Sequence, residues 1–278
     1  GSGMSVEELK DQINKARKAT DGIIGVNIMV AIKEFKQLVD ISIQEGVDLI
    51  VAGAGFSRDI FSKVKDTGVE VVPIVSSLRL AKISEKMGAS AIVVEGKEAG
   101  GHLGTDKTLI SLLKRIVNNV KIPVIAAGGI INGKDIAEVL NLGASGVQIG
   151  SRFVASKECE VNDEFKNCYI NATEDDGVLI DSPVGLPGRG LINNFIEKLK
   201  NNNVHTGESC NYLCLKKCSR NFCIMKALLK AREGDMDNGL VFAGERAHLI
   251  NNILPVKEII KRLVDEAKNF YNGEDKNG

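Results

Sequence analysis

Two stretches decide the fold: Pro123-Val124-Ile125-Ala126-Ala127-Gly128-Gly129-Ile130 and, one helix-patterned segment later, Gly146-Val147-Gln148-Ile149-Gly150-Ser151-Arg152-Phe153. Each begins as a continuous apolar run and ends on glycine. Continuous rather than alternating hydrophobicity is typical of strands that are buried on both faces of a parallel sheet. The segment between them, Lys134–Leu142, carries apolar residues at three- and four-residue steps, which predicts a helix. The two stretches therefore predict neighbouring βα units.

The same alternation of strand and helix extends upstream. Four further apolar runs predict strands at Ile23–Val30, Val47–Ala52, Glu70–Val75 and Ala91–Glu95. Amphipathic segments between them predict helices at Lys33–Gln44, Leu78–Met87 and Lys107–Val117. The spacing predicts an α/β fold, either a barrel or a doubly wound sheet. Glycine-rich turns recur at several strand ends, and Arg58 stands where a dinucleotide fingerprint would place its third glycine, so a TIM (β/α)8-type barrel is favoured.

The position of the glycine-ended strands predicts an incomplete barrel. If they are strands 7 and 8, Ile23–Val30 is strand 3, and strands 1 and 2 are lacking. Six parallel strands would leave two open edges. The strand and helix alternation stops near Ser156, so we expect a partial barrel over residues 1–156. Residues 157–278 are predicted to form a mainly helical appendage, with one extended piece at Val178–Val184 and helices at 222–233 and 255–270.

The composition of the chain indicates which kinds of ligand it binds and where in the cell it is located. The chain has 278 residues, 44% of them hydrophobic, and its 36 Lys and Arg balance 36 Asp and Glu. No excess charge favours a nucleic acid or a membrane surface as partner. No apolar run reaches the roughly 18 residues of a membrane span, and the first residues lack a secretory signal pattern. We therefore expect a cytoplasmic protein with a small-molecule substrate.

The glycines at the two strand ends predict a phosphate site. Gly128, Gly129 and Gly150 would let backbone N–H groups approach an anion closely, with Ser151 beside them. In TIM barrels the loops after strands 7 and 8 commonly bind phosphate. The alternative is that these glycines only permit tight βα turns.

Several motifs together resemble a known family. They are Gly25-Val26-Asn27-Ile28-Met29, Glu95-Gly96-Lys97-Glu98-Ala99-Gly100-Gly101-His102, Ala126-Ala127-Gly128-Gly129-Ile130, Gln148-Ile149-Gly150-Ser151-Arg152-Phe153 and Gly239-Leu240-Val241-Phe242-Ala243-Gly244. The chain resembles the FMN-dependent nitronate monooxygenases, formerly 2-nitropropane dioxygenases, and the closely similar flavin-type enoyl-acyl-carrier-protein reductases. The resemblance implies a (β/α)8 barrel with a helical lid. It also implies two initial strands and a Gly-Gly-Met flavin contact that this sequence lacks.

The resemblance implies roles for individual residues. His102 would lie beside the flavin ring and act in catalysis. Asn27 and Glu95 would contact the flavin or shape its pocket, Gln148 would line the same floor, and Gly128, Gly129, Gly150 and Ser151 would hold the phosphate. Without the resemblance, a single histidine on a loop such as His102 is more often a surface residue or one with its hydrogen bonds satisfied. Glu95 is then equally well explained as a solvated carboxylate at a strand end. Asn27 lies within an apolar run, where we expect a buried amide that needs hydrogen-bond partners.

The implied activity is an FMN-dependent oxidation of nitronates or nitroalkanes by molecular oxygen. A neutral imidazole, with a reference pKa of about 6.5, would accept the proton α to the nitro group. NAD(P)H-dependent reduction of an enoyl thioester is the alternative within the same class. Two alternatives belong to other classes of protein. One is a phosphate-binding barrel enzyme without flavin. The other is a non-catalytic fragment, for which we expect association at the open edge of the sheet, for instance as a homo-oligomer.

Four cysteines lie close together in the sequence: Cys210, Cys214, Cys218 and Cys223. Such a cluster in a cytosolic protein favours a metal, either zinc or an iron–sulfur cluster. On one continuous helix Cys210 and Cys218 would stand about 12 Å apart along the axis, too far to share an ion. A metal site therefore requires a turn, near Asn211 or at Ser219-Arg220-Asn221. The alternative is four free thiols.

Overall fold

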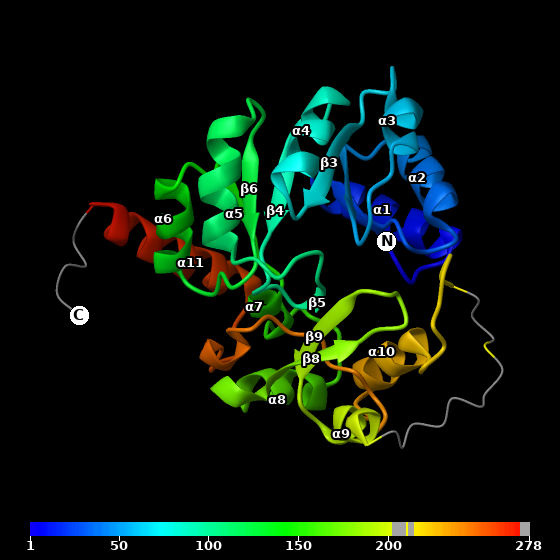
Figure 1. The fold of residues 1–278 in the computed structure, drawn as a ribbon, viewed down its shortest axis with the longest axis vertical. Coiled ribbons are helices and arrows are strands. Elements are labelled where there is room, and N and C mark those ends of the chain that lie inside the picture. The colour runs from blue at the N-terminus through cyan, green and yellow to red at the C-terminus, as the bar shows by residue number, and fades with distance from the viewer. Residues whose placement is uncertain (202–209, 211–213, 273–278) are drawn as a thin grey trace.

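The computed structural model describes residues 1–201, 210 and 214–272, and its first half is built on one parallel sheet (Figure 1). The sheet has the order β1-β2-β3-β4-β6-β7. Its strands are β1 (Gly25–Met29), β2 (Leu49–Gly53), β3 (Glu70–Val75), β4 (Ile92–Glu95), β6 (Val124–Ala127) and β7 (Gly146–Gln148). Every neighbouring pair is parallel. All six predicted strands are therefore confirmed, and β1 and β7 form the two predicted edges.

Helices follow the strands and cover one face of the sheet. They are α2 (Phe35–Gln44), α3 (Asp59–Val64), α4 (Leu78–Lys86), α5 (Leu109–Ile116) and α6 (Gly133–Asn141). Helix α1 (Val6–Ala19) precedes them and was not predicted, although its start carries a clear signal. Ser5 accepts a hydrogen bond from the Glu8 amide, and the Glu8 side chain accepts one from the Ser5 amide. This capping box is readable as Ser-x-x-Glu in the sequence.

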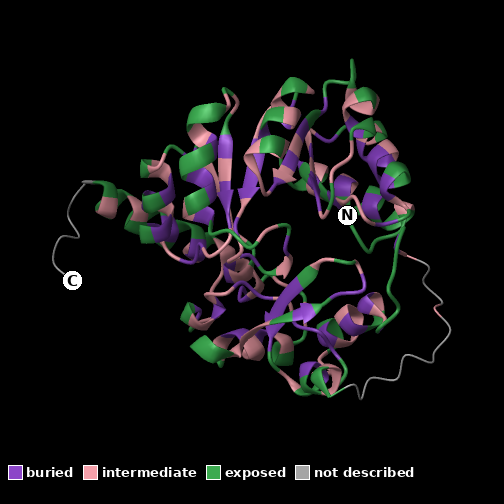
Figure 2. Cartoon of the chain, in the orientation of Figure 1, coloured by how far each residue is buried: buried purple, intermediate pink, exposed green. Residues whose placement is uncertain are grey.

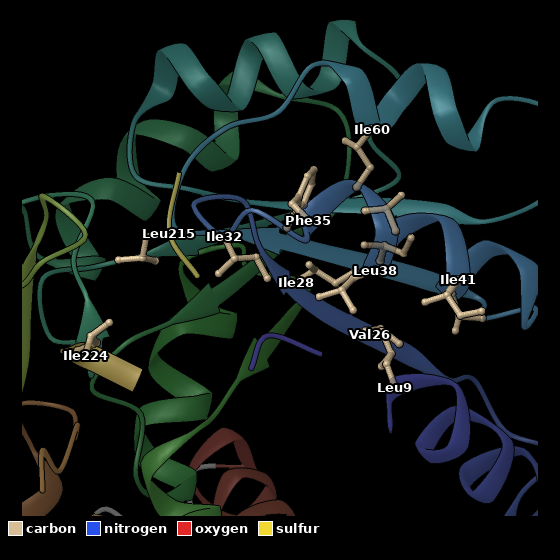
Figure 3. Packing of buried hydrophobic residues seen from close by; sticks show 14 of the residues in the cluster. Leu9, Val26, Ile28, Ile32, Phe35, Leu38, Ile41, Ile60, Leu215 and Ile224 are labelled. Atoms are coloured by element: carbon tan, nitrogen blue, oxygen red, sulfur yellow. The ribbon is translucent and has the colours of Figure 1, made fainter. Parts of the chain in front are cut away.

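Two apolar clusters hold the helices to the sheet. One surrounds β1 and β2 and includes Ile28, Phe35 and Leu38; the other lies under α4 and α5 and includes Leu113 and Ile116. Strand residues are mostly buried while the outer helix faces are exposed (Figure 2). Figure 3 shows Leu215 and Ile224, from the C-terminal part of the chain, packing into the first cluster. The core therefore joins the two parts of the chain.

The C-terminal part contains helices and a small sheet. The helices are α7 (Ser151–Val154), α8 (Asp163–Ile170), α9 (Asn194–Lys200), α10 (Ile224–Glu233) and α11 (Val256–Asn272), with 3₁₀ turns at Val117–Asn119, Glu174–Asp176 and Ala247–Leu249 along the chain. The sheet is antiparallel, in the order β5-β9-β8, with β5 (Gly101–His102), β8 (Gly177–Asp181) and β9 (Pro187–Leu191). The helices predicted at 222–233 and 255–270 are confirmed. The sheet was not predicted, because β5 has two residues and β9 contains two glycines.

Helix α11 runs back across the molecule to lie beside α6 (Figure 1). The amide of Gly133, the first residue of α6, donates a hydrogen bond of 2.8 Å to the Glu266 carboxylate of α11. Among the described residues, no helix is both long and apolar enough to cross a lipid bilayer.

Gly133 is the tightest point between α6 and α11, which gives the first prediction. A Cβ atom at position 133 would lie 2.3 Å from Glu266 Cβ and 2.4 Å from the Ala267 backbone nitrogen. We expect Gly133→Ala to lower the free energy of unfolding by about 1–3 kcal/mol, because α11 must move away. Urea unfolding measures the change. Glu138→Ala, at an exposed position of the same helix, is the control, and equal stability of Gly133→Ala and the unsubstituted protein would contradict the prediction.

Candidate active site

A cavity of about 270 Å³ opens at the carboxyl ends of the barrel strands. Strands β4, β6 and β7 contribute one wall, and the segment 242–246 from the C-terminal part contributes another. The lining residues are Glu95, Ala99, Gly100, Gly101, Ala127, Gly128, Gly129, Ile130, Ile131, Gln148, Gly150, Ser151, Val154, Tyr169, Phe242, Ala243, Gly244 and Arg246. Six of the eight residues predicted for catalysis or cofactor binding are therefore brought together: Glu95, Gly128, Gly129, Gln148, Gly150 and Ser151.

The glycine pair after β6 has a backbone that suits a bound anion. Gly128 and Gly129 have φ angles of +106° and +72°, a region that favours glycine. A Cβ would lie 3.1 Å from the Ala99 amide nitrogen at the first position and 3.0 Å from Glu98 Cβ at the second. At Gly150 an added Cβ would meet nothing within 4 Å. The glycine pair therefore packs closely against Glu98 and Ala99, whereas the backbone at Gly150 is open. All three glycines line the cavity, where a phosphate group would fit.

Ser151 connects the barrel to the segment that closes the cavity. Its Oγ accepts a hydrogen bond of 2.9 Å from the Gly244 amide. Because a hydroxyl that accepts a bond still has its own proton to donate, Ser151 remains able to donate to an anion in the cavity.

Glu95 ends β4 and is the acidic side chain among the described residues that line the cavity. Burial raises the pKa of its carboxyl to about 7, because a low-dielectric environment disfavours the charged form. The side chain is thus partly buried in the cavity wall and titrates near neutral pH. Glu95 is therefore not the fully solvated carboxylate that was the alternative interpretation of the sequence.

His102 lies next to the cavity but is not among its lining residues. Its Nε2 is 2.7 Å from Ser182 Oγ, and its ring packs edge-on against Phe242, with centroids 5.1 Å apart. Phe242 itself lines the cavity. Burial lowers the pKa of the imidazole, so the ring is neutral at pH 7. Since Ser182 engages Nε2, Nδ1 is the nitrogen left for another partner.

Asn27 corrects one expectation. A buried amide was predicted, but the side chain is exposed, and Asn27 is not among the residues that line the cavity. The reason is that β1 is an edge strand whose side chains alternate: Val26 and Ile28 are buried, whereas Gly25 and Asn27 are exposed. The backbone oxygen of Asn27 accepts a bond of 2.8 Å from the amino group of Gly1. A flavin contact by Asn27 stays a prediction.

The cysteine segment is not one helix. Leu215 pairs with Ile32 in an antiparallel bridge, Arg220 has a φ of +61°, and α10 begins only after Cys223. The turn that a metal site requires at Ser219-Arg220-Asn221 is therefore present. Burial, followed by the nearby thiols of Cys223, Cys210 and Cys218, raises the pKa of Cys214.

The described cysteines nevertheless do not form a ready metal site. Across residues 1–201, 210 and 214–272, no group of three or more His, Cys, Asp or Glu side chains is arranged to hold a metal ion. All six cysteines are free thiols. Binding of zinc or an iron–sulfur cluster by Cys210, Cys214, Cys218 and Cys223 stays a prediction from their spacing.

Among the cavity residues that were not predicted, three carry an aromatic or charged side chain: Tyr169, Phe242 and Arg246. Tyr169 is fully buried, and its hydroxyl donates a hydrogen bond to the Phe242 backbone oxygen. Arg246 Nη1 donates to the Gly129 oxygen at 2.8 Å and to Asp135 Oδ1 at 2.7 Å. Phe242 lies inside the motif Gly239–Gly244, which is a usable signal for it, whereas Arg246 lies two residues beyond the motif.

A family model described as nitronate monooxygenase matches residues 3–266. The chain belongs to this family. A probable nitronate monooxygenase of Staphylococcus aureus is 30% identical over 245 residues, which cover 72% of this chain and 69% of that protein. A 5-hydroxy-7a-methyl-1-oxo-octahydro-1H-indene-4-carboxyl-CoA dehydrogenase of Rhodococcus jostii is 32% identical over 225 residues. That match covers 81% of this chain but only 62% of the dehydrogenase.

Solved structures agree with the barrel. FabK from Thermotoga maritima superposes with a TM-score of 0.88 at 34% identity, covering 98% of this chain and 84% of that protein. A nitroalkane oxidase from Streptomyces ansochromogenes gives a TM-score of 0.82 at 20% identity, covering 99% and 88%, and shows likeness of fold alone. Together with the six-stranded parallel sheet, these neighbours confirm the predicted TIM-barrel-type fold for this nitronate monooxygenase family member.

The buried carboxyl of Glu95 gives the second prediction. Its pKa is 4.5 in the reference state and about 7 in the fold. As pH rises through this window the unfolded chain loses a proton that the folded chain keeps, so the protein becomes less stable. Glu95→Gln should remove that loss, and its stability relative to the unsubstituted protein should therefore rise by up to about 3 kcal/mol between about pH 4.5 and pH 7.

Urea unfolding of the flavin-free protein at about pH 5 and about pH 8 measures this difference. Glu138→Gln, at an exposed position, is the matched control and should show no such pH dependence. A Glu95→Gln effect of equal size at both pH values would show that the carboxyl is not held protonated by burial.

Proposed function

We propose that this protein is an FMN-dependent oxidoreductase that oxidises nitronates or nitroalkanes with molecular oxygen. One observation carries the proposal: the two strand-end glycine loops converge with Glu95 and Arg246 on a single cavity. Membership of the nitronate monooxygenase family over residues 3–266 supports the same conclusion. When bound, the flavin would supply the electron transfer.

The phosphate end of the cofactor would rest on the two glycine loops. Backbone N–H groups at Gly128, Gly129 and Gly150 would donate to it, together with the Ser151 hydroxyl. All three glycines line the cavity, and without side chains their backbone can approach an anion closely. Gly128 and Gly129 also have positive φ angles, whereas Gly150, with a φ of −109°, has open space around it. Gln148 would line the floor of the cavity beside them.

His102 would act as the proton acceptor in this reaction. Burial keeps the imidazole neutral, which is the form that accepts a proton. Ser182 holds Nε2 and fixes the ring plane, so Nδ1 would take the proton α to the nitro group. Phe242, packed edge-on against the ring, excludes water from one side of the imidazole.

A second candidate is NAD(P)H-dependent reduction of an enoyl thioester. FabK is a flavin-type enoyl-acyl-carrier-protein reductase, and its likeness to this chain favours the second candidate. The two sequences are 34% identical, and the match covers 98% of this chain. The name of the R. jostii relative also specifies a CoA ester. The two candidates share the phosphate loops and His102 and differ in electron donor and acceptor.

The first test is whether the purified protein retains flavin. Incubation with FMN followed by desalting should leave visible flavin absorbance in the protein fraction. Oxygen uptake with a nitroalkane, compared with NAD(P)H oxidation in the presence of an enoyl thioester, then separates the two candidates. Absence of retained flavin would favour a phosphate-binding barrel without flavin or a non-catalytic fragment, and would contradict the proposal.

His102→Ala tests the proton acceptor. We expect bound FMN to be retained while turnover falls by roughly 100-fold or more, because proton transfer loses its base. In the unsubstituted protein, turnover should fall as pH decreases through a pKa below 6.5, since burial disfavours the protonated ring. Ser182→Ala, which keeps the imidazole but removes its hydrogen bond, should cause a smaller loss. Unchanged turnover in His102→Ala would remove the assignment.

A further inference from the structure

Arg246 is the cationic side chain of the cavity. Among the described residues that line it, no other lysine, arginine or histidine is present. The residue lies on the segment that crosses from the C-terminal part to the barrel mouth, and its side chain is partly accessible, at 37%. Its guanidinium stands directly beside the glycine loop, because Nη1 donates to the Gly129 backbone oxygen at 2.8 Å.

Asp135 fixes the orientation of Arg246. Its Oδ1 accepts the Arg246 hydrogen bond at 2.7 Å, and its Oδ2 accepts from the amides of Ile131 at 2.8 Å and Asn132 at 3.2 Å. Asp135 is itself buried, with 8% exposure. A carboxylate with partners on both oxygens has little freedom to rotate. Both Arg246 bonds use Nη1, which leaves the N–H groups of Nη2 and Nε as further donors of the guanidinium.

The glycine loop alone does not provide a full positive charge. A helix N-terminus commonly supplies part of that charge in phosphate sites, and α6 begins just after the loop. Here, however, the first amides of α6 have partners within the chain: Gly133 donates to Glu266, and Asp135 donates to Asn132. A phosphate monoester carries about −1.5 to −2 charges at pH 7, so the cavity needs a cation from elsewhere.

We propose that Arg246, held in place by Asp135, binds the phosphate of the flavin and so selects FMN over unphosphorylated riboflavin. The inference rests on the proposed function. The guanidinium pairs with phosphate through charge-assisted hydrogen bonds. Because Arg246 and Gly129 belong to different parts of the chain and are already hydrogen-bonded, the phosphate would also link the segment 242–246 to the barrel.

The test compares the affinities of FMN and riboflavin by fluorescence titration of the flavin-free protein. The unsubstituted chain should bind FMN more tightly than riboflavin. Arg246→Met should weaken FMN binding by roughly 10- to 100-fold, the range for losing hydrogen bonds to a charged group, and should leave riboflavin affinity nearly unchanged. Arg246→Lys should recover part of the loss. Arg115→Met, at an exposed position of α5, is the matched control and should change neither affinity.

Asp135→Asn provides a second measurement. It keeps Arg246 but replaces the charged partner that orients it, so FMN affinity should fall less than in Arg246→Met while riboflavin affinity stays the same. Because Asp135 also caps α6, thermal unfolding is used to check that the Asp135→Asn variant is folded. If that variant is unfolded, the role of Arg246 is decided by the Arg246→Met and Arg246→Lys variants alone.

The outcomes separate this inference from the proposed function. If the unsubstituted protein binds neither flavin, the proposed function fails and the role of Arg246 fails with it. If both flavins bind and Arg246→Met weakens them equally, or weakens neither, the proposed function stands and the phosphate role of Arg246 is overturned. A loss confined to FMN supports it.

Discussion

Close approach of two backbone segments is the constraint on which the site depends. At Gly100, an added Cβ would lie 2.5 Å from the Ala243 carbonyl carbon and 2.6 Å from the Gly244 nitrogen. Only glycine allows the loop after β4 to touch the segment 242–246 in this way. That contact closes the second wall of the cavity and places Phe242 and Arg246 on it. A side chain at position 100 would clash with the backbone of Ala243 and Gly244, so the two segments would have to move apart.

The cavity is lined by one cationic side chain, Arg246, and one acidic side chain, Glu95, among the described residues. Arg246 is paired with Asp135 through Nη1 alone, which partly offsets its charge and leaves the other guanidinium N–H groups as donors. Glu95 titrates near neutral pH, because burial raises its pKa to about 7. An unpaired buried charge is costly, and the pairing of Arg246 with Asp135 and the raised pKa of Glu95 both reduce that cost.

The sequence predicts local features of this molecule better than distant contacts. The six strands follow from continuous apolar runs, and the glycine loops follow from their position after those runs. Burial of Asn27 was predicted wrongly, because the apolar run around it was read as buried on both faces, whereas on the edge strand β1 only Val26 and Ile28 are buried and Asn27 faces out. Arg246 was missed since its partner Asp135 is 111 positions away. The capping box at Ser5 and Glu8, by contrast, is a local signal that marks the start of α1 in the sequence.

The placement of His102 on β5 has a mechanical consequence. Although β5 follows the barrel loop, it pairs with β9 of the antiparallel sheet, and Ser182 follows directly after β8 of that sheet. A rigid rotation of this sheet would carry imidazole and hydroxyl together, preserving the angle between them. The distance from the imidazole to the cavity would then change while its hydrogen bond to Ser182 stays in place.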